Sequence, residues 1–221
     1  MKLKTKNTGH DAGEATLPFF TFGEASRFDF FSRMLSKVDS LEGDLVECGV
    51  GWGRSLIHLL SIMHKTEKVR NLWAFDSFEG FPEPTEEDIS FRNPRKGEWR
   101  SDIRSIEKML NDAGFSDEYL RQRLIFVKGY FEDTLRDYRG APIAFLHADA
   151  DLYESYRSIL DRLYDHVLPG GVIVFDEYRN TWEHEKFPGA ATAIDEFFEG
   201  KERIVRDSLF GKFYVVKACE S

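Results

Sequence analysis

The chain has 221 residues, of which 42% are hydrophobic and 31% are charged, and its formal net charge is −9 at pH 7. This length fits one α/β domain with some additional segments. The negative net charge argues against a nucleic-acid-binding surface, which needs a basic footprint. The polar N-terminal segment has no apolar core of a signal peptide, and no apolar run is long enough to cross a membrane. Only two cysteines, Cys48 and Cys219, are present, so we expect a cytoplasmic protein with neither a disulfide nor a membrane partner.

Strands and helices are predicted to alternate along the chain. After a mobile arm at 1–17, aromatic residues at 19–20 and 28–34 predict a helical segment that ends near Ser40. A turn is predicted at 168–171, Leu-Pro-Gly-Gly. The alternation predicts a mainly parallel sheet with helices on both faces. Strands are predicted at 45–48, 71–75, 124–127, 143–146, 172–175, 203–207 and 213–216, and helices at 54–64, 103–113, 152–166 and 190–199.

The predicted domain organisation is an N-terminal arm and helix at 1–40, followed by one domain at 41–221. Within that domain, residues 79–99 form a polar insertion with three prolines and many charged residues. The insertion also contains Phe91 and Trp99. Such a segment suits a lid over the acceptor or a partly disordered loop, and an ordinary solvated loop is the simpler alternative. The aromatic stretch 19–31 suits either the core or a subunit interface of a homo-oligomer.

Glycines at alternate positions follow the first predicted strand. Glu47 is followed by Gly49, Gly51 and Gly53 and then by an apolar helical stretch. Glycines admit a ligand close to the backbone, and the helix N-terminus offers unpaired N–H groups. The dinucleotide fingerprint G-x-G-x-x-G would need glycine where Arg54 stands, which argues against a nucleotide-dependent oxidoreductase. An acidic residue before the glycines suits an amine-bearing ligand, although a strand–helix turn with surplus glycines is the simpler interpretation.

Polar residues also end the next two predicted strands. Ligands of parallel sheets bind beyond the carboxyl ends of the strands. Asp76 stands at one such end, where its carboxylate can accept hydrogen bonds from both ribose hydroxyls of a nucleoside. Gly129, Tyr130 and Phe131 stand at another, where they can enclose an adenine ring. An acid in this position can equally be a helix cap or a turn former.

Carboxylates gather at the ends of the following two strands. Asp149 ends one strand, and Asp176 and Glu177 end the next. Adjacent strands lie close enough for these acids to converge, and oxygen ligands suit Mg²⁺ or Mn²⁺. Asp151 and Glu154 form the D-x-x-E pattern of a capping box and are weaker ligand candidates. Solvated caps without a metal remain the alternative.

Taken together, these segments resemble the TylF/MycF (macrocin O-methyltransferase-like) family of class I S-adenosylmethionine-dependent methyltransferases. The resemblance implies a Rossmann-like, seven-stranded sheet with an antiparallel C-terminal strand. It also implies an S-adenosylmethionine- and Mg²⁺-dependent O-methyltransferase that acts on a hydroxyl of a small molecule, such as a sugar of a glycosylated natural product. The matching segments are GDLVECGVGWG at 43–53, AFDSFEGFPEP at 74–84, VKGYFEDTL at 127–135, HADADLYES at 147–155, LPGGVIVFDEY at 168–178 and FPGAATAIDEFF at 187–198.

Residue roles follow from the matched positions. The metal positions fall on Asp149, Asp176 and Glu177, and Asp149 is also expected to be catalytic. Glu47 and the glycines are expected at the methionine end of the cofactor, and Asp76 at its ribose. The full predicted cofactor set is Glu47, Gly49, Gly51, Ser55, Asp76, Ser77, Gly129, Tyr130, Phe131 and Asp149.

Two departures from the family pattern concern the metal and the base. Glu177 stands where the family usually has aspartate, and its longer side chain shifts the carboxylate. Arg179 stands where members can carry a histidine base, and arginine stays protonated. His184 is then the candidate catalytic base, with His147 a weaker one that is better explained as a core residue. A metal-independent methyltransferase acting on a carboxylate or amine, and a non-catalytic cofactor-binding protein, remain as alternatives.

Overall fold

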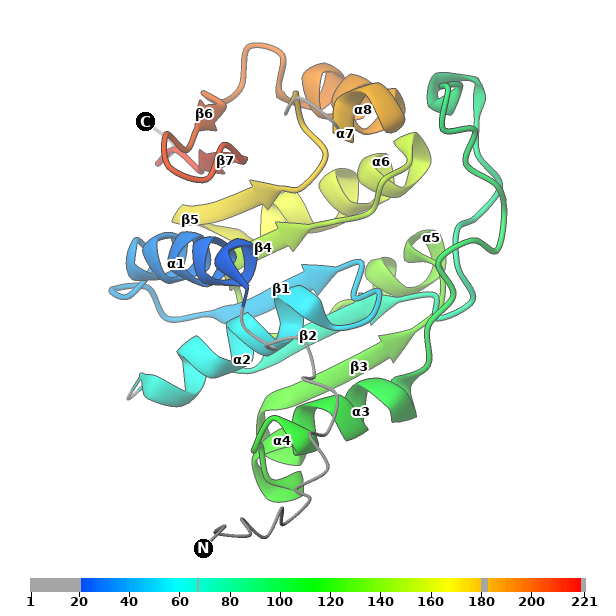
Figure 1. Ribbon diagram of the computed structural model, residues 1–221. Helices are drawn as coiled ribbons and strands as arrows, with labels where there is room; N and C mark the ends of the chain where they lie inside the picture. Colours follow the sequence, from blue (N-terminus) through cyan, green and yellow to red (C-terminus); the bar gives the residue numbers. More distant parts are fainter. Residues whose placement is uncertain (1–20, 67, 180–182, 220–221) are drawn as a thin grey trace, which may run out of the picture.

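The computed structural model describes residues 21–66, 68–179 and 183–219, so the predicted arm at 1–17 lies outside the described residues. Seven strands form one sheet in the order β3-β2-β1-β4-β5-β7-β6 (Figure 1). Neighbours from β3 to β5 pair in parallel, whereas β7 runs antiparallel to both β5 and β6. This confirms the predicted fold class. The strands are β1 (Asp44–Cys48), β2 (Leu72–Asp76), β3 (Leu124–Lys128), β4 (Ile143–Ala148), β5 (Val167–Phe175), β6 (Val205–Arg206) and β7 (Phe213–Val216).

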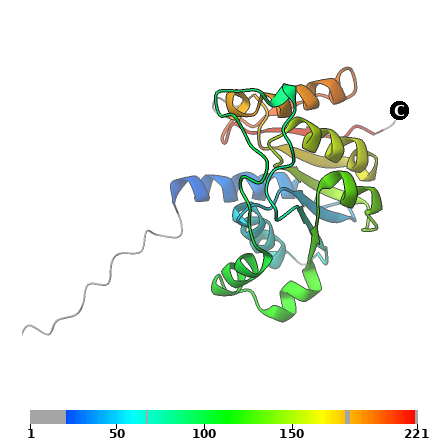
Figure 2. The same ribbon diagram turned by 90° about the vertical axis from the view of Figure 1, so that its right-hand side faces the viewer.

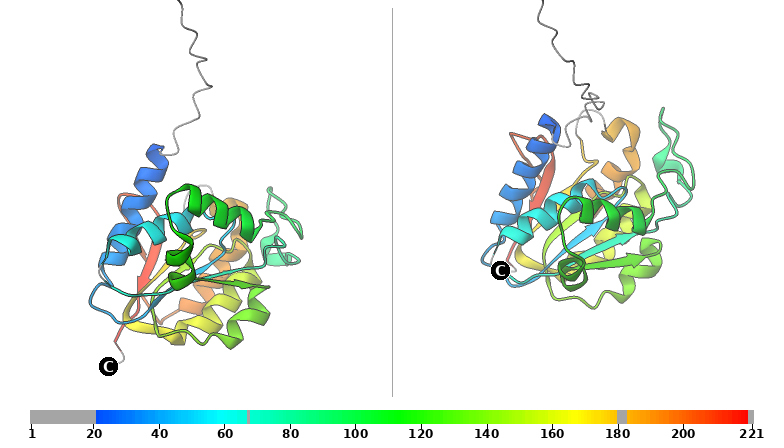
Figure 3. Two further views of the ribbon diagram at one scale, coloured as in Figure 1. Left: turned by 90° about the horizontal axis from the view of Figure 1, so that it is seen from below. Right: turned by 60° about the horizontal axis from the view of Figure 1, so that its bottom comes forward.

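Helices cover both faces of the sheet, as Figure 3 shows from below. Alternate residues of the central strands contribute to two separate cores, because side chains of a strand point to opposite faces in turn. Phe145 belongs to the core under α1, α2 and α3, whereas Leu146 belongs to the core under α6 and α8. The helices are α1 (Phe22–Ser36), α2 (Arg54–Lys65), α3 (Ile103–Asp112), α4 (Asp117–Arg123), α5 (Phe131–Thr134), α6 (Tyr153–Leu163), α7 (Glu183–Lys186) and α8 (Pro188–Phe198).

The predicted aromatic N-terminal helix begins at Phe22, because the Thr21 side chain accepts a hydrogen bond from the Glu24 N–H and caps it. Phe30 and Phe31 are buried in the core, whereas Phe22 is 89% exposed. Within the described part of the stretch 19–31, Phe30 and Phe31 therefore belong to the core. The short helix α4 was not predicted; it begins where the Ser116 side chain caps its first turn.

The turn predicted at 168–171 is wrong, because these residues lie inside β5. The register of β5 against β4 shifts here, from Ile143 opposite Val167 to Phe145 opposite Val172. The extra residues form an irregularity that stays hydrogen-bonded, since the Gly170 N–H donates to the Lys217 carbonyl at 2.8 Å. Gly170 has a φ of 79°, which glycine adopts at little cost. A Pro-Gly-Gly bulge in a strand therefore resembles a turn in the sequence.

The insertion at 79–99 lies beyond the ends to which the strand arrowheads point (Figure 1), and Figure 2 looks onto this edge. Asp88 fixes it to the domain: it is 1% exposed, and its carboxylate accepts hydrogen bonds from the N–H groups of Thr85 and Tyr153, both at 2.9 Å. Ser90 donates to the Lys186 carbonyl at 2.6 Å. The insertion is therefore anchored to the first turn of α6 and to α7, unlike a solvated loop.

None of the helices in the described part of the chain combines the length and the apolar character that crossing a bilayer requires.

Candidate active site

A cavity of about 310 Å³ opens at the carboxyl edge of the sheet. Its walls come from the turn after β1, from the residues that follow β2, β4 and β5, from the insertion and from the start of α6. This is the position at which parallel α/β sheets bind their ligands. The cavity is therefore the place where the predicted cofactor and metal residues are expected to lie.

Asp76 organises one half of the cavity. Its Oδ2 accepts hydrogen bonds from the N–H groups of Val50 at 2.9 Å and Gly51 at 3.0 Å, and its Oδ1 accepts one from Phe78 at 2.6 Å. Burial raises the pKa of this carboxyl, and the three backbone donors oppose that rise. Asp76 thus holds the glycine turn in place, and Oδ1 keeps a lone pair for a further donor.

Gly49 brings the two halves of the cavity together. Its φ is 95°, and a Cβ built on it would lie 1.6 Å from the Asp149 carbonyl oxygen. Only a residue without a Cβ fits there. Of the ten predicted cofactor residues, eight line the cavity, and the exceptions are Glu47 and Gly129. The eight are Gly49, Gly51, Ser55, Asp76, Ser77, Tyr130, Phe131 and Asp149.

Strand alternation decides which acids meet in the other half. His147, Asp149 and Asp176 offer one ligand atom each within 4.8 Å of one another. Along β4 and beyond it, residues 147 and 149 share a face, and Asp176 reaches the same face from the end of β5. The structure therefore brings together two of the three predicted metal ligands and adds His147.

Glu177 does not join this group, because it directly follows Asp176 and points to the other side. It is 2% exposed, and its Oε2 accepts hydrogen bonds from the Tyr156 hydroxyl at 2.6 Å and from the Asp151 N–H at 3.3 Å. Burial, together with the charges of Asp151 and of the other nearby acids, raises the pKa of Glu177. Glu177 thus contacts Tyr156 of α6 and the backbone just before this helix.

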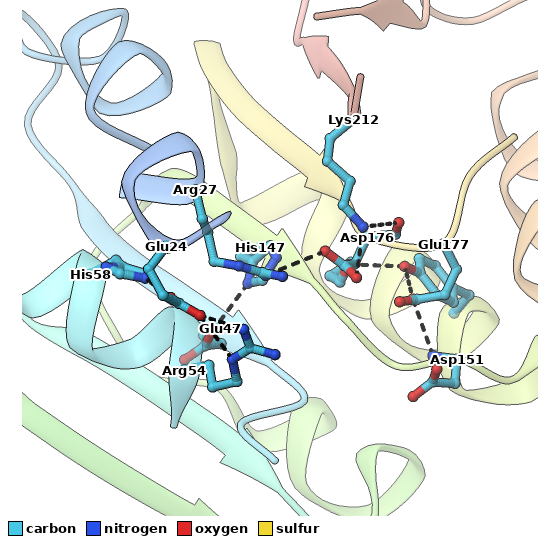
Figure 4. A network of polar contacts seen from close by, with 12 residues as sticks. Glu24, Arg27, Glu47, Arg54, His58, His147, Asp151, Asp176, Glu177 and Lys212 are labelled. Carbon is cyan, nitrogen blue, oxygen red and sulfur yellow. Dashed lines mark hydrogen bonds and ion pairs between the residues drawn. The ribbon is translucent and has the colours of Figure 1, made fainter. Parts of the chain in front are cut away.

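Two cations compensate the charge of Asp176, as Figure 4 shows. The Lys212 ammonium lies 2.8 Å from Asp176 Oδ2 and donates a hydrogen bond to the Asp176 carbonyl at 2.7 Å, and Arg27 lies 3.9 Å from Oδ1. Although burial works against ionisation, Lys212 and Arg27 hold the pKa of Asp176 well below its usual range. Burial and repulsion by Asp176 raise the pKa of Asp149 to about 7.

His147 is fully buried between β1 and β5, and its Nδ1 lies 3.1 Å from Glu47 Oε1. Burial opposes protonation, but the hydrogen bond to Glu47 and the charge of Asp149 outweigh it and raise the pKa of His147. Among the described residues, neither the Nε2 of His147 nor the Oε2 of Glu47 has a hydrogen-bond partner. A satisfied core histidine would use both ring nitrogens, so the interpretation as a simple core residue is incomplete.

The predicted capping box at Asp151 and Glu154 is wrong. The first turn of α6 is capped by Asp88 from the insertion, through its hydrogen bond with the Tyr153 N–H. Asp151 instead adopts a φ of 63°, is 5% exposed and lines the cavity. A non-glycine residue held in the left-handed region often marks a functional position. The local sequence pattern alone did not distinguish these two roles.

Aromatic side chains form the rim of the cavity. Trp52 and Trp99 line it, and their ring centroids are 6.2 Å apart. The ring centroid of Phe81 lies 5.4 Å from that of Trp99. Arg92 stacks over the rings of Trp99 and Phe81 and forms an ion pair with Glu98. Phe91, predicted to take part in the lid, is 74% exposed and does not line the cavity.

Of the two candidate bases, His147 is the one that lies with Asp149 and Asp176. His184 belongs to α7 and is not among the residues that line the cavity. Arg179 pairs with Asp195, and the hydrogen bonds with Asp195 and Tyr178 raise its pKa, which keeps it protonated. Neither Arg179 nor His184 belongs to the group of His147, Asp149 and Asp176 that the described residues form.

The fold and this site define a class I S-adenosylmethionine-dependent methyltransferase architecture, and solved structures share it. The O-methyltransferase NovP superposes with a TM-score of 0.72 at 24% identity, covering 88% of this chain and 80% of NovP. The calicheamicin methyltransferase CalS11 superposes with a TM-score of 0.76 at 21% identity, covering 89% and 80%. At these identities the likeness establishes the fold.

The macrocin-O-methyltransferase (TylF) family model matches residues 2–206, and the chain belongs to that family. A tetracenomycin-C-derivative 4'-O-methyltransferase of Streptomyces olivaceus is 32% identical over 146 residues, which is 63% of this chain and 54% of that protein. Mycinamicin III 3''-O-methyltransferase of Micromonospora griseorubida is 27% identical over 152 residues, or 63% and 57%. The chain thus spans a little over half the length of these curated relatives.

Proposed function

We propose that this protein transfers the methyl group of S-adenosylmethionine to a hydroxyl of a small molecule, specifically a sugar of a glycosylated natural product. The observation that carries the proposal is the single cavity that joins a glycine turn held by Asp76 to acids at the ends of β4 and β5. Relatives named as O-methyltransferases of glycosylated compounds support the acceptor class.

The cofactor half of the cavity suits a nucleoside with a methionine tail. We assign Asp76 Oδ1 to accept a hydrogen bond from a ribose hydroxyl. Tyr130 and Phe131, which line the cavity, offer aromatic surface for an adenine ring. Gly49 and Gly51 let the tail approach the backbone. In the reaction, the acceptor oxygen forms a bond to the methyl carbon as the sulfonium–carbon bond breaks, releasing S-adenosylhomocysteine and a proton.

A divalent cation, Mg²⁺ in the family, fits the donor set. Asp149 and Asp176 supply carboxylates that converge, and His147 belongs to the same group, with its buried Nε2 unpaired as far as the described residues go. When bound there, the ion would polarise the acceptor hydroxyl. The proposed Mg²⁺ requirement rests on Asp149 and Asp176, because Glu177 is engaged by Tyr156 and Asp151.

The released proton is assigned to Asp151 in preference to His184. Asp151 lines the cavity next to Asp149, and the backbone bond to Glu177 fixes its unusual conformation. Replacing Asp151 by Asn should lower turnover strongly while leaving the affinity for S-adenosylhomocysteine unchanged. Equal turnover of the Asn variant, together with loss in His184→Gln, would return the role to His184.

The acceptor is expected to enter beside Trp52 and Trp99. Indole faces bind the apolar face of a sugar ring well, and both rings lie on the rim of the same cavity. The insertion that carries Trp99 is anchored by Asp88, so this wall is formed before the acceptor binds.

Isothermal titration with S-adenosylhomocysteine, in Mg²⁺ and in EDTA, tests the proposal first. We expect micromolar binding that Asp149→Ala leaves nearly intact, together with a Mg²⁺ site that the variant loses. Methylation of glycosylated acceptors in a subsequent screen should then depend on Asp149. Absence of cofactor binding would overturn the methyltransferase assignment.

A metal-independent reaction is the second candidate, because Lys212 and Arg27 already compensate the charge of Asp176. Full turnover of the wild-type protein in EDTA would favour it. Turnover that EDTA abolishes and Mg²⁺ restores would exclude it.

A further inference from the structure

We infer that His147 is itself a metal ligand through Nε2, so that the site is a mixed nitrogen–oxygen site with Asp149 and Asp176 and prefers Mn²⁺ over Mg²⁺. This inference rests on the proposed function only in requiring that a divalent cation binds. It differs from the site predicted from the sequence, in which Glu177 was the third ligand and all ligands were oxygen atoms.

The first support is an unpaired nitrogen. His147 is 0% exposed, and its Nε2 has no hydrogen-bond partner in the described part of the chain, in a group whose ligand atoms all lie within 4.8 Å of one another. A buried polar atom without a partner costs about 1–3 kcal/mol, so native proteins rarely leave one unsatisfied. An ion between the imidazole and the two carboxylates would satisfy it.

The second support is the hydrogen bond on the other side of the ring. Glu47 Oε1 lies 3.1 Å from His147 Nδ1. A carboxylate in this position favours a proton on Nδ1 and leaves the lone pair of Nε2 for a metal, which is the usual arrangement of metal-bound histidines. Glu47 does not line the cavity, so this role explains its burial better than direct cofactor contact does.

The third support is the rigidity of the scaffold. His147 and Asp149 stand two residues apart at the end of β4, and Asp176 follows β5, whose Phe175 pairs with Ala148. Ligands on neighbouring central strands are held more firmly than ligands on loops. Glu177, by contrast, is held on the other face by Tyr156.

The ligand chemistry sets the metal preference. Mg²⁺ prefers oxygen ligands, whereas imidazole suits first-row transition ions, and Mn²⁺ also accepts carboxylates. A neutral imidazole adds a ligand without adding negative charge beside Asp149 and Asp176. Lys212 compensates part of that charge already, so the site gains less from carboxylate attraction alone.

Pulsed electron paramagnetic resonance of the Mn²⁺-loaded full chain tests the inference without any substitution. We expect modulation from a directly bound ¹⁴N nucleus, and its replacement by a ¹⁵N pattern when the protein carries ¹⁵N-histidine. Bound Mn²⁺ without nitrogen modulation would overturn the inference. Failure to bind Mn²⁺ would overturn it as well, and a parallel titration with S-adenosylhomocysteine shows whether the proposed cofactor binding survives.

Titrations of Mn²⁺ and Mg²⁺ supply the matched variants. We expect Mn²⁺ to bind the wild type at least about tenfold more tightly than Mg²⁺, and His147→Gln to lose most of this preference. Glu47→Gln, which alters the ring partner, should weaken Mn²⁺ binding by about 10- to 100-fold. His64→Gln is the control, since His64 lies at the last turn of α2 against Phe115 and Tyr119. An unchanged preference in a folded His147→Gln protein would contradict the inference.

Discussion

The two halves of the cavity hold their carboxylates by different means. On the β1–β2 side, Asp76 is held by three backbone N–H groups, from Val50, Gly51 and Phe78. On the β4–β5 side, Asp176 is held by the side chains of Lys212 and Arg27, which come from the segment before β7 and from α1. One half thus relies on backbone N–H donors and the other on charged side chains.

This difference separates geometry from electrostatics. Backbone donors fix the position of Asp76 and leave its local charge uncompensated by any salt bridge in the described residues. The charged partners of Asp176 instead give two neighbouring acids different pKa values. The pKa of Asp176 is lowered, whereas that of Asp149 is raised to about 7. We expect the first half to respond to substitutions that disturb its backbone packing or hydrogen bonds, and the second to substitutions that remove a charge.

The junction between the halves should be the most sensitive point. Gly49→Ala places a Cβ 1.6 Å from the Asp149 carbonyl oxygen at a φ of 95°, so the backbone must move. We expect a loss of more than about 4 kcal/mol in the free energy of unfolding, measured with urea. Gly51→Ala is the matched control: its φ is 52° with nothing within 4 Å, and about 1 kcal/mol is expected. Similar losses in both variants would contradict the close approach of the halves.

Lys212→Met tests the charged half. Lys212 is 6% exposed, and its removal leaves the Asp176 carboxylate without its nearest cation. Breaking such a pair costs about 3–5 kcal/mol, which we expect as a loss of stability in EDTA at pH 7. Lys108→Met, which removes an exposed pair with Asp112, should cost less than about 1 kcal/mol. A loss as small as that of the control would show that Asp176 does not depend on Lys212.

The sequence could predict the parts that local patterns mark. The glycine turn, the strands and the place of Asp76 at a strand end follow from apolar runs and glycine spacing, although two of the N–H groups that fix Asp76 lie 25 and 26 positions away in the chain. The turn at 168–171 was mispredicted, since a Pro-Gly-Gly bulge inside β5 has the composition of a turn. The capping box failed for a related reason: the partner of the first turn of α6 is Asp88, far away in the chain.

The charged half could be predicted only in part. Asp149 and Asp176 follow strands, which the sequence reveals, and strand alternation applied strictly would have favoured His147 over Glu177 as their neighbour. Lys212 and Arg27 carried no local signal, because their contacts with Asp176 depend on how α1 and the segment before β7 pack against the sheet.

Asp76→Asn tests the backbone-held half with little change of shape. In the wild type, both carboxylate oxygens of Asp76 accept hydrogen bonds from backbone N–H groups. In the variant, the amide N–H₂ replaces one of these oxygens and cannot accept, so at least one hydrogen bond is lost. We expect the affinity for S-adenosylhomocysteine to fall by about 10- to 100-fold, or about 1.4–2.7 kcal/mol, by calorimetry. Asp44→Asn is the control: it also breaks bonds from Asn71 and Trp73, but at the other end of β1, and should leave this affinity unchanged. Equal affinity of Asp76→Asn would separate Asp76 from the cofactor.

The pH dependence of Asp149→Asn tests the division between the two acids. The pKa of Asp149 is about 7 in the folded protein and near 3.8 in the unfolded chain, so between these pH values the folded state alone holds the proton. Stability of the wild type therefore falls as pH rises through this window, and the Asn variant escapes that loss. In EDTA, we expect Asp149→Asn to gain about 1–2 kcal/mol relative to wild type between pH 5 and pH 8. If the difference in stability between Asp149→Asn and the wild type stayed constant between pH 5 and pH 8, burial and the charge of Asp176 would not raise the pKa of Asp149 in the folded protein.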